Sequence, residues 1–301
     1  MKKKSFFQLL MIGLSGIRLE ATMSKAFSSY AVIASVCLAL AACGGENNSA
    51  PSPVAQNMPT TLAAASSISD ASTTAGDFHI VAPNATFFGK TYSQRAKSFW
   101  EWAMALPLAG HPFAACPDPN DSAAFAKQQS GNGNVWYWSA PDGPLTCNAT
   151  LPVGKALFLT IRDVETSTLE APPFYGATEA DRRENSKWWA DHIINVFVVI
   201  DGVPVENLQA YRLPNGTADF EFTAPTPWIF GDTGGKGRSV ADGYYVMLDF
   251  LSKGNHTIHY GGTFHFKAGE IKARYGSKIA ELFGNGPLDF PKDVTIELTV
   301  E

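Results

Sequence analysis

Residues 243–266, GYYVMLDFLSKGNHTIHYGGTFHF, contain two apolar runs of strand length on either side of Lys253-Gly254-Asn255, a tripeptide typical of a tight turn. We therefore predict a β-hairpin, a unit common in sandwich domains. The last segment, DVTIELTV (293–300), alternates apolar residues with Thr and Glu, which predicts a strand with one buried and one solvated face. Residues 192–208, HIINVFVVIDGVPVENL, predict a further strand, an Asp-Gly turn and a short extended piece.

Two segments have helical spacing instead. In TYSQRAKSFWEWAMALP the apolar side chains recur every three or four residues, between a cap at Thr91 or Ser93 and a stop at Pro107. In TEADRRENSKWWADHI acidic residues follow Thr178, which favours a helix that begins there. Further expected elements are a short helix at 122–129 and strands at 78–82, 134–141 and 155–165.

The predicted fold class follows from this distribution. Many short strands, turns rich in Gly, Pro and Asn, and only two convincing helices favour an all-β fold with helical insertions, an antiparallel β-sandwich of immunoglobulin-like or jelly-roll-like type. A parallel α/β fold needs a helix between most strands, and the sequence does not predict these.

The first 42 residues have the features of an export signal. Lysines 2–4 precede one apolar run and Lys25 precedes a second, and both runs are too short to span a bilayer comfortably. The second run ends in Leu40-Ala41-Ala42-Cys43, which resembles the bacterial lipobox, where a signal peptidase cuts before a lipid-modified cysteine. We expect residues 1–42 to be a signal region, with Met23 as an alternative start, and Cys43 to carry the lipid. An ordinary secretory signal with an accidental cysteine is the other interpretation.

Lipidation at Cys43 implies a location and a domain organisation. Two acyl chains anchor a protein stably, and Gly44 is not the aspartate that resembles an inner-membrane retention signal, so we expect the outer membrane of a bacterial cell envelope. Residues 43–76 are rich in Ser, Ala, Thr, Asn and Pro and predict a disordered tether. Residues 77–301 then form one sandwich domain.

The net charge and the cysteines indicate which partners and which cellular compartment to expect. Removing residues 1–42 would take away five of the 23 Lys and Arg and one of the 28 Asp and Glu, and would move the formal net charge from −5 to −9. Such a surface repels phosphate backbones, so nucleic acid is not an expected partner. We predict a disulfide between Cys116 and Cys147 in an oxidising compartment, with two buried free thiols as the alternative. No cofactor is predicted.

Five segments resemble a group of exported bacterial proteins that has no assigned activity. They are FWEWAMALP, QQSGNGNVWYW, LPVGKALF, IDGVPVENLQAYR and ADGYYVMLDFLSKGNHTIHYGGTF, and they cover much of residues 98–264. The resemblance implies one extended domain. It implies no reaction and no functional residues.

The seven tryptophans all lie between positions 100 and 228. Flat aromatic rings stack on sugars, so Trp100, Trp102, Trp136 and Trp138 are candidates for a glycan-binding surface. The alternative is that these large side chains fill the core, which is the interpretation we favour.

Acid–base chemistry needs two carboxylates, or a carboxylate and a histidine, in one cleft. Asp163 and Glu165 are two residues apart in a predicted strand and so share a face, and His111 or His192 are candidates to approach them. Charged residues near a strand end are more often solvated.

His259 and His265 are weak candidates for a metal site. Strand parity places His256 and His259 on opposite faces, so one ion cannot bind both unless a bulge intervenes. His259 and His265 share a face, and Gly261-Gly262 between them is a candidate position for a bulge. Parity favours solvated histidines beside inward apolar side chains, and we predict no metal.

Three functions fit these observations. The leading hypothesis is an outer-membrane-anchored lipoprotein whose domain binds a glycan or an envelope protein without catalysis. A hydrolase of an extracellular polymer is the alternative, with Asp163 and Glu165 as its acids. A structural or assembly subunit with an exposed aromatic patch is the third.

Overall fold

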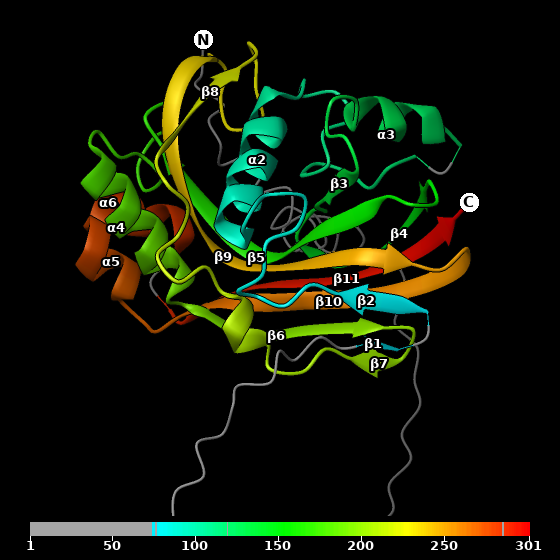
Figure 1. The fold of residues 1–301 in the computed structure, drawn as a ribbon. Coiled ribbons are helices and arrows are strands. Elements are labelled where there is room, and N and C mark those ends of the chain that lie inside the picture. The colour runs from blue at the N-terminus through cyan, green and yellow to red at the C-terminus, as the bar shows by residue number, and fades with distance from the viewer. Residues whose placement is uncertain (1–73, 76, 119, 285) are drawn as a thin grey trace, which may run out of the picture. The chain divides into compact units, whose positions relative to one another are not determined.

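Two β-sheets stack face to face and form a β-sandwich with helical insertions, as the sequence predicts (Figure 1). The first sheet has the order β1-β2-β9-β5-β3, with β8 also paired to β9, and the second has the order β4-β11-β10-β6-β7. The strands are β1 (Thr74–Ala75), β2 (Phe78–Ile80), β3 (Val135–Trp138), β4 (Gly143–Leu151), β5 (Ala156–Ser167), β6 (Ile193–Ile200), β7 (Val203–Pro204), β8 (Phe220–Ala224), β9 (Gly235–Leu251), β10 (Gly254–Phe266) and β11 (Leu288–Val300).

This computed structural model describes residues 74–75, 77–118, 120–284 and 286–301. The predicted signal region, Cys43 and most of the predicted tether lie outside the described residues.

The two long strands of 243–266 do not form the predicted hairpin. β9 pairs with β2, β5 and β8 in the first sheet, while β10 pairs with β6 and β11 in the second, so residues 252 and 253 connect one sheet to the other. Residues 239–248 of β9 are buried without alternation, whereas β10 alternates between buried and accessible residues over much of its length. A continuous apolar run is typical of a strand covered on both faces. A short polar turn can connect strands of two different sheets as well as the two strands of a hairpin.

Each sheet contains one parallel pair, which corrects the purely antiparallel prediction. β3 is parallel to β5 because the chain passes through β4 in the second sheet before it returns. β4, which the sequence does not predict, is parallel to β11 at the edge of the second sheet. The closing strand β11 has the expected pattern, with Val294, Ile296 and Leu298 buried.

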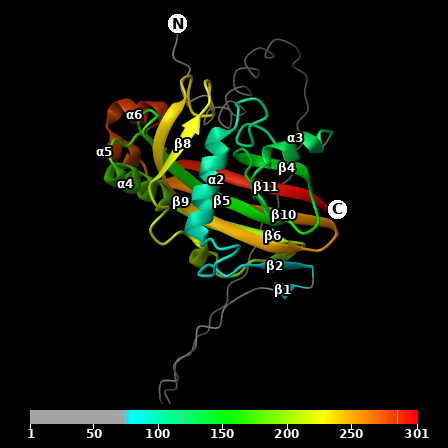
Figure 2. The same cartoon turned by 45° about the horizontal axis from the view of Figure 1, so that its top comes forward.

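The helices cover the first sheet and one end of the sandwich. α2 (Tyr92–Ala105) begins at a capping box of Thr91 and Gln94, ends before Pro107, and packs on β8 and β9. Figure 2 shows α2 crossing the first sheet. α4 begins at a capping box of Thr178 and Asp181. The other helices are α3 (Ser122–Gln128), α4 (Glu179–Ala190), α5 (Glu270–Tyr275), α6 (Ser277–Phe283) and the 3-10 turn η1 (Leu208–Tyr211).

α4, α5 and α6 lie together at one end of the sandwich (Figure 1). The sequence does not predict α5 and α6, which are six and seven residues long. None of the helices in the described part of the chain has the length and apolarity needed to cross a membrane.

Cys116 and Cys147 form the predicted disulfide, with their Cα atoms 5.3 Å apart. The bond joins the segment that follows α2 to the edge strand β4. Cys147 is 1% exposed, so this cross-link is part of the core.

Candidate functional site

The four predicted tryptophans are buried, with exposed fractions of 4% for Trp100, 9% for Trp102, 6% for Trp136 and 1% for Trp138. Three of their indole N–H groups donate inside the protein: Trp100 to the Tyr245 hydroxyl (3.2 Å), Trp102 to the Gln128 carbonyl (2.7 Å) and Trp138 to the Tyr260 hydroxyl (2.9 Å). All four side chains belong to the core, which is the interpretation that we favour from the sequence. Large apolar rings with a single donor are accommodated best where that donor finds an internal acceptor.

Asp163 and Glu165 lie in β5, and both carboxyl groups are inside the protein. Burial raises the pKa of Asp163 to about 6, against the opposing charge of Lys292. Burial also raises the pKa of Glu165 to about 7. Neither carboxylate lines either of the two cavities described below.

The two candidate histidines are engaged by other groups. His111 is fully buried, with Nε2 at 2.9 Å from the Ala103 carbonyl and Nδ1 accepting from the Phe113 N–H at 3.1 Å. Burial lowers the pKa of His111 to about 4, so the ring is neutral near pH 7 and tethers the end of α2. His192 bonds the Trp188 carbonyl at 2.7 Å and stacks on Phe266. The predicted catalytic set is therefore not assembled in this structure.

His259 and His265 are partly exposed, as strand parity indicates. Each ring lies 2.7 Å from a carboxylate of β11, that of Asp293 or that of Asp289. The register between β10 and β6 shifts between Gly261 and Thr263, at the predicted position, and the extra residue is on the β6 side, where Asn195 has a positive φ of 54°. Among the described residues no three side chains of the kinds that bind metals gather at one point.

A groove of about 310 Å³ lies beside α4 at the helical end of the sandwich. One wall is formed by segment 172–177, the floor by Asp181, Glu184 and Asn185 of α4, and the other wall by Arg274 and Tyr275 of α5. We call this concavity the α4 groove. The first wall and the floor are close in sequence, whereas Arg274 is 89 residues from Asn185, so only the fold brings the second wall to them.

Aromatic and polar side chains meet in the α4 groove. The ring of Tyr175 is 42% exposed. Arg274 donates to Glu184 (2.7 Å) and to the Asn185 side-chain oxygen (3.2 Å). Burial raises the pKa of Tyr275 to about 12, so its hydroxyl keeps its proton and donates to Asn185 at 3.4 Å. The groove thus presents ring faces together with donors and acceptors of hydrogen bonds.

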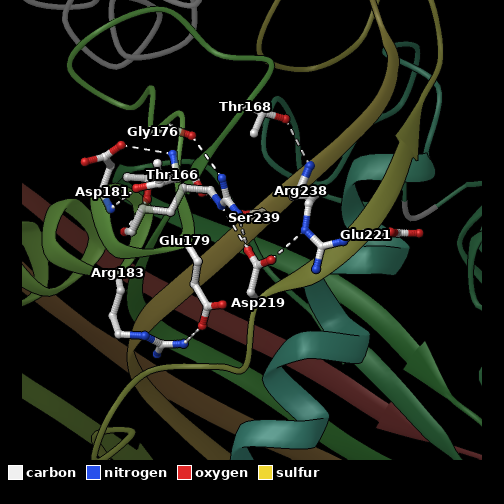
Figure 3. Close-up of polar contacts among 12 residues, drawn as sticks. Thr166, Thr168, Gly176, Glu179, Asp181, Arg183, Asp219, Glu221, Arg238 and Ser239 are labelled. Carbon is white, nitrogen blue, oxygen red and sulfur yellow. Dashed lines mark hydrogen bonds and ion pairs between the residues drawn. The ribbon is translucent and has the colours of Figure 1, made fainter.

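Arg182 of α4 holds the first wall in place from beneath. Its Nη1 donates to the carbonyls of Gly176 (3.1 Å) and Ala177 (3.2 Å). A Cβ atom on Gly176 would lie 2.6 Å from Arg182 Cγ, so only glycine allows this approach. Asp219 accepts from Arg182 on one oxygen. It accepts from Arg238 on the other (Figure 3). The wall is therefore fixed to α4, to β9 and to the segment before β8.

A larger cavity, of about 340 Å³, lies where α3 meets β4, β10 and β11. Phe125 is the aromatic residue of its lining, and it is 6% exposed and packs edge-on against Trp136 and Trp138. The buried Phe125 ring therefore presents no face to a sugar in this cavity. The smaller α4 groove, with the exposed Tyr175, is the better candidate for ligand binding.

The residues of the α4 groove were not among the candidates found in the sequence. Pro172-Pro173 ahead of Tyr175 is a local signal of an exposed loop that carries an aromatic ring, and Tyr275-Gly276 is a local signal of a helix end. The helix predicted from Thr178 onward is α4, which forms the floor of the groove. What the sequence lacks is any sign that α5 packs beside α4.

No protein-family model matches the chain, and no curated protein sequence matches it. Two solved structures share a weak likeness with it. The structure of PbICP-C in complex with falcipain-2 is 14% identical over 56% of this chain and 100% of that chain, with a TM-score of 0.20. The solution structure of Amebosin is 9% identical over 53% of this chain and 100% of that chain, with a TM-score of 0.13. Similarities this low support no inference about fold or function.

Proposed function

We propose that this chain is a lipid-anchored protein of a bacterial cell envelope whose sandwich domain binds a glycan in the α4 groove. The observation that supports binding most directly is the exposed ring of Tyr175 at the rim of a concavity whose other side chains include a guanidinium, two carboxylates and an amide. Aromatic rings contact the apolar faces of sugars, while such polar groups bond the hydroxyls. The proposal includes no catalytic step, because Asp163 and Glu165 line neither cavity.

Replacing Tyr175 with alanine tests the binding role. We expect the Kd for a bound glycan to rise about tenfold, which corresponds to about 1.4 kcal/mol of lost binding free energy. The measurement is calorimetric titration of the purified chain with soluble peptidoglycan fragments and with core oligosaccharides of lipopolysaccharide. Phe250→Ala is the matched control, since Phe250 is 51% exposed on β9 and does not line the groove. Failure of every glycan to bind, or equal losses in both variants, would refute this role.

Replacing Cys43 with serine tests the anchor. We expect the variant to leave the membrane fraction of cells that express the full-length gene, because a hydroxyl cannot take the place of the thiolate that is alkylated. Mass spectrometry of the N-terminal peptide of the wild type should show a diacylglyceryl cysteine at position 43. Cys37→Ser is the control, since Cys37 precedes the predicted cleavage point. An unmodified Cys43 in the mature chain contradicts the lipid anchor.

A further inference from the structure

Two buried carboxyl groups meet behind the first wall of the α4 groove. Glu165 of β5 is 3% exposed and Glu170, in the segment that follows β5, is 6% exposed. Each carboxyl group affects the pKa of the other, so the two side chains are neighbours. Glu165 Oε1 is completely buried and accepts no hydrogen bond from any described residue. A protonated Glu170 carboxyl group is the donor that can reach it. Two ionised carboxylates cannot satisfy that oxygen, whereas a proton held between them does.

The hydroxyl of Ser239 is shared between this pair and the backbone. Its hydroxyl oxygen lies 3.0 Å from the Thr166 carbonyl, which can only accept, and also contacts Glu165 Oε2 at hydrogen-bonding distance. A serine hydroxyl has one hydrogen to donate. Donated to Glu165 Oε2, this hydrogen favours the ionised carboxylate and lowers the pKa of Glu165, but burial raises that pKa by more. Donated to the Thr166 carbonyl, it leaves Glu165 as the donor to Ser239, which requires a protonated carboxyl group.

The pair is connected directly to the wall of the groove. Ser167 donates to Glu170 at 3.1 Å. The backbone of Ser167 also pairs with the wall, since its N–H donates to the Phe174 carbonyl and its carbonyl accepts from the Gly176 N–H, both at 3.0 Å. Segment 168–177 therefore leaves and rejoins β5 at Ser167, with Glu170 near its base and Tyr175 near its end.

We propose that the Glu165–Glu170 pair is a proton-dependent latch on segment 168–177. With a proton between the carboxyl groups the segment stays closed, and loss of that proton places two like charges side by side in the core and opens the segment. The consequence for ligand binding rests on the proposed function of the α4 groove. The latch itself does not depend on it.

No cation offsets this charge among the described residues. Arg182 of α4 and Arg238 of β9 belong to the polar network around the first wall, and both are bonded to Asp219. On β5 itself Arg162 is paired with Asp142, and Asp163 raises the pKa of Glu165 further. Ser239 from β9 and Ser167 from β5 are neutral. The pair therefore faces one further carboxylate and hydroxyl groups.

The sign of the pH dependence follows from these surroundings. Burial raises the pKa of Glu165 to about 7 and raises that of Glu170 as well, with the charge of Glu165 adding to the latter. In the unfolded chain both groups ionise near their ordinary value of 4.5. The closed state thus holds more protons than the open state above that value, so closure weakens as pH rises and is lost above about pH 7.

Amide hydrogen exchange of segment 168–177 in the full-length chain tests the latch without any ligand. After correction for the intrinsic exchange rate, we expect the opening equilibrium constant of the wild-type segment to increase at least tenfold between pH 6 and pH 9. A tenfold change in an equilibrium constant is equivalent to a pKa difference of about one unit between the closed and open states. Glu170→Gln should suppress the increase, because the amide donates to Glu165 Oε1 at every pH. Glu165→Gln should do the same and serves if the first variant does not fold. Glu221→Gln is the control, since Glu221 is exposed and should leave the wild-type profile unchanged.

A flat wild-type profile, or an unchanged increase in the Gln variants, would overturn the latch. If the profile behaves as expected, glycan affinity should fall over the same pH range and should become pH-independent in Glu170→Gln. A protein that binds no glycan at any pH overturns the proposed function, while the exchange result still decides the latch.

Discussion

Replacing Asp219 with alanine is expected to lower the free energy of unfolding by about 3–5 kcal/mol. Arg182 is 2% exposed, and Asp219 is the carboxylate that faces its guanidinium, with bonds of 2.9 Å and 2.6 Å to one oxygen. Removing one partner of a buried ion pair leaves the other charge without compensation, and this costs much more than the net contribution of the intact pair. Urea denaturation with comparison of both midpoint and slope measures the loss.

Glu221→Ala is the matched control for this prediction. Glu221 lies near Asp219, bonds the same Arg238, and has an 80% exposed side chain (Figure 3). An exposed ion pair is screened by water, so its removal should leave the unfolding midpoint close to that of the wild type. If both variants unfold at the same midpoint, the buried network is not a major source of stability.

The same substitution should affect the α4 groove. The Arg182 guanidinium that Asp219 orients also donates to the carbonyls of Gly176 and Ala177 in the groove wall. A guanidinium without its carboxylate tends to move toward water, and it would take those two bonds with it. Reduced glycan affinity in Asp219→Ala, at temperatures where the variant is still folded, would show that this ion pair positions the wall.

The sequence predicts those helices and strands whose ends or buried faces are determined by residues within the element itself. The capping boxes at Thr91 and Thr178 and the stop at Pro107 define two helices, and the alternation of β11 defines a half-solvated strand. The connection between β9 and β10 has no such local signal. Whether two strands pair with each other or join different sheets depends on what covers each face, and that is decided by α2 and by β5, which are distant in sequence.

The same distinction applies to the candidate sites. Predictions that depend on strand parity are confirmed, such as the opposite environments of His256, which is buried, and His259, which is not. Predictions that bring residues from distant parts of the chain into one site are not confirmed. His111 is bonded to a backbone carbonyl of α2, and His192 is bonded to one of α4. The α4 groove was missed for that reason as well, since Tyr175 and Tyr275 become neighbours only when α5 packs beside α4.

The disulfide is expected to contribute about 3–4 kcal/mol to stability. Cys116 and Cys147 are 31 residues apart in sequence, and the chain-entropy model assigns this amount to closing a loop of that length in the unfolded chain. The bond also fixes the segment after α2 against β4, an edge strand whose one neighbour in the described part of the chain is β11. We therefore expect Cys116→Ala/Cys147→Ala to fold with a markedly lower urea midpoint.

Reducing the wild type tests this prediction by an independent route. Wild-type protein in excess dithiothreitol should match the double variant within about 1 kcal/mol, and dithiothreitol should have no effect on the double variant itself. Both routes remove the same cross-link, but only the variant removes the sulfur atoms, of which that of Cys147 is buried. A large loss in the variant with little loss on reduction would assign the effect to packing at position 147, and the cross-link would then not be what stabilises the edge strand.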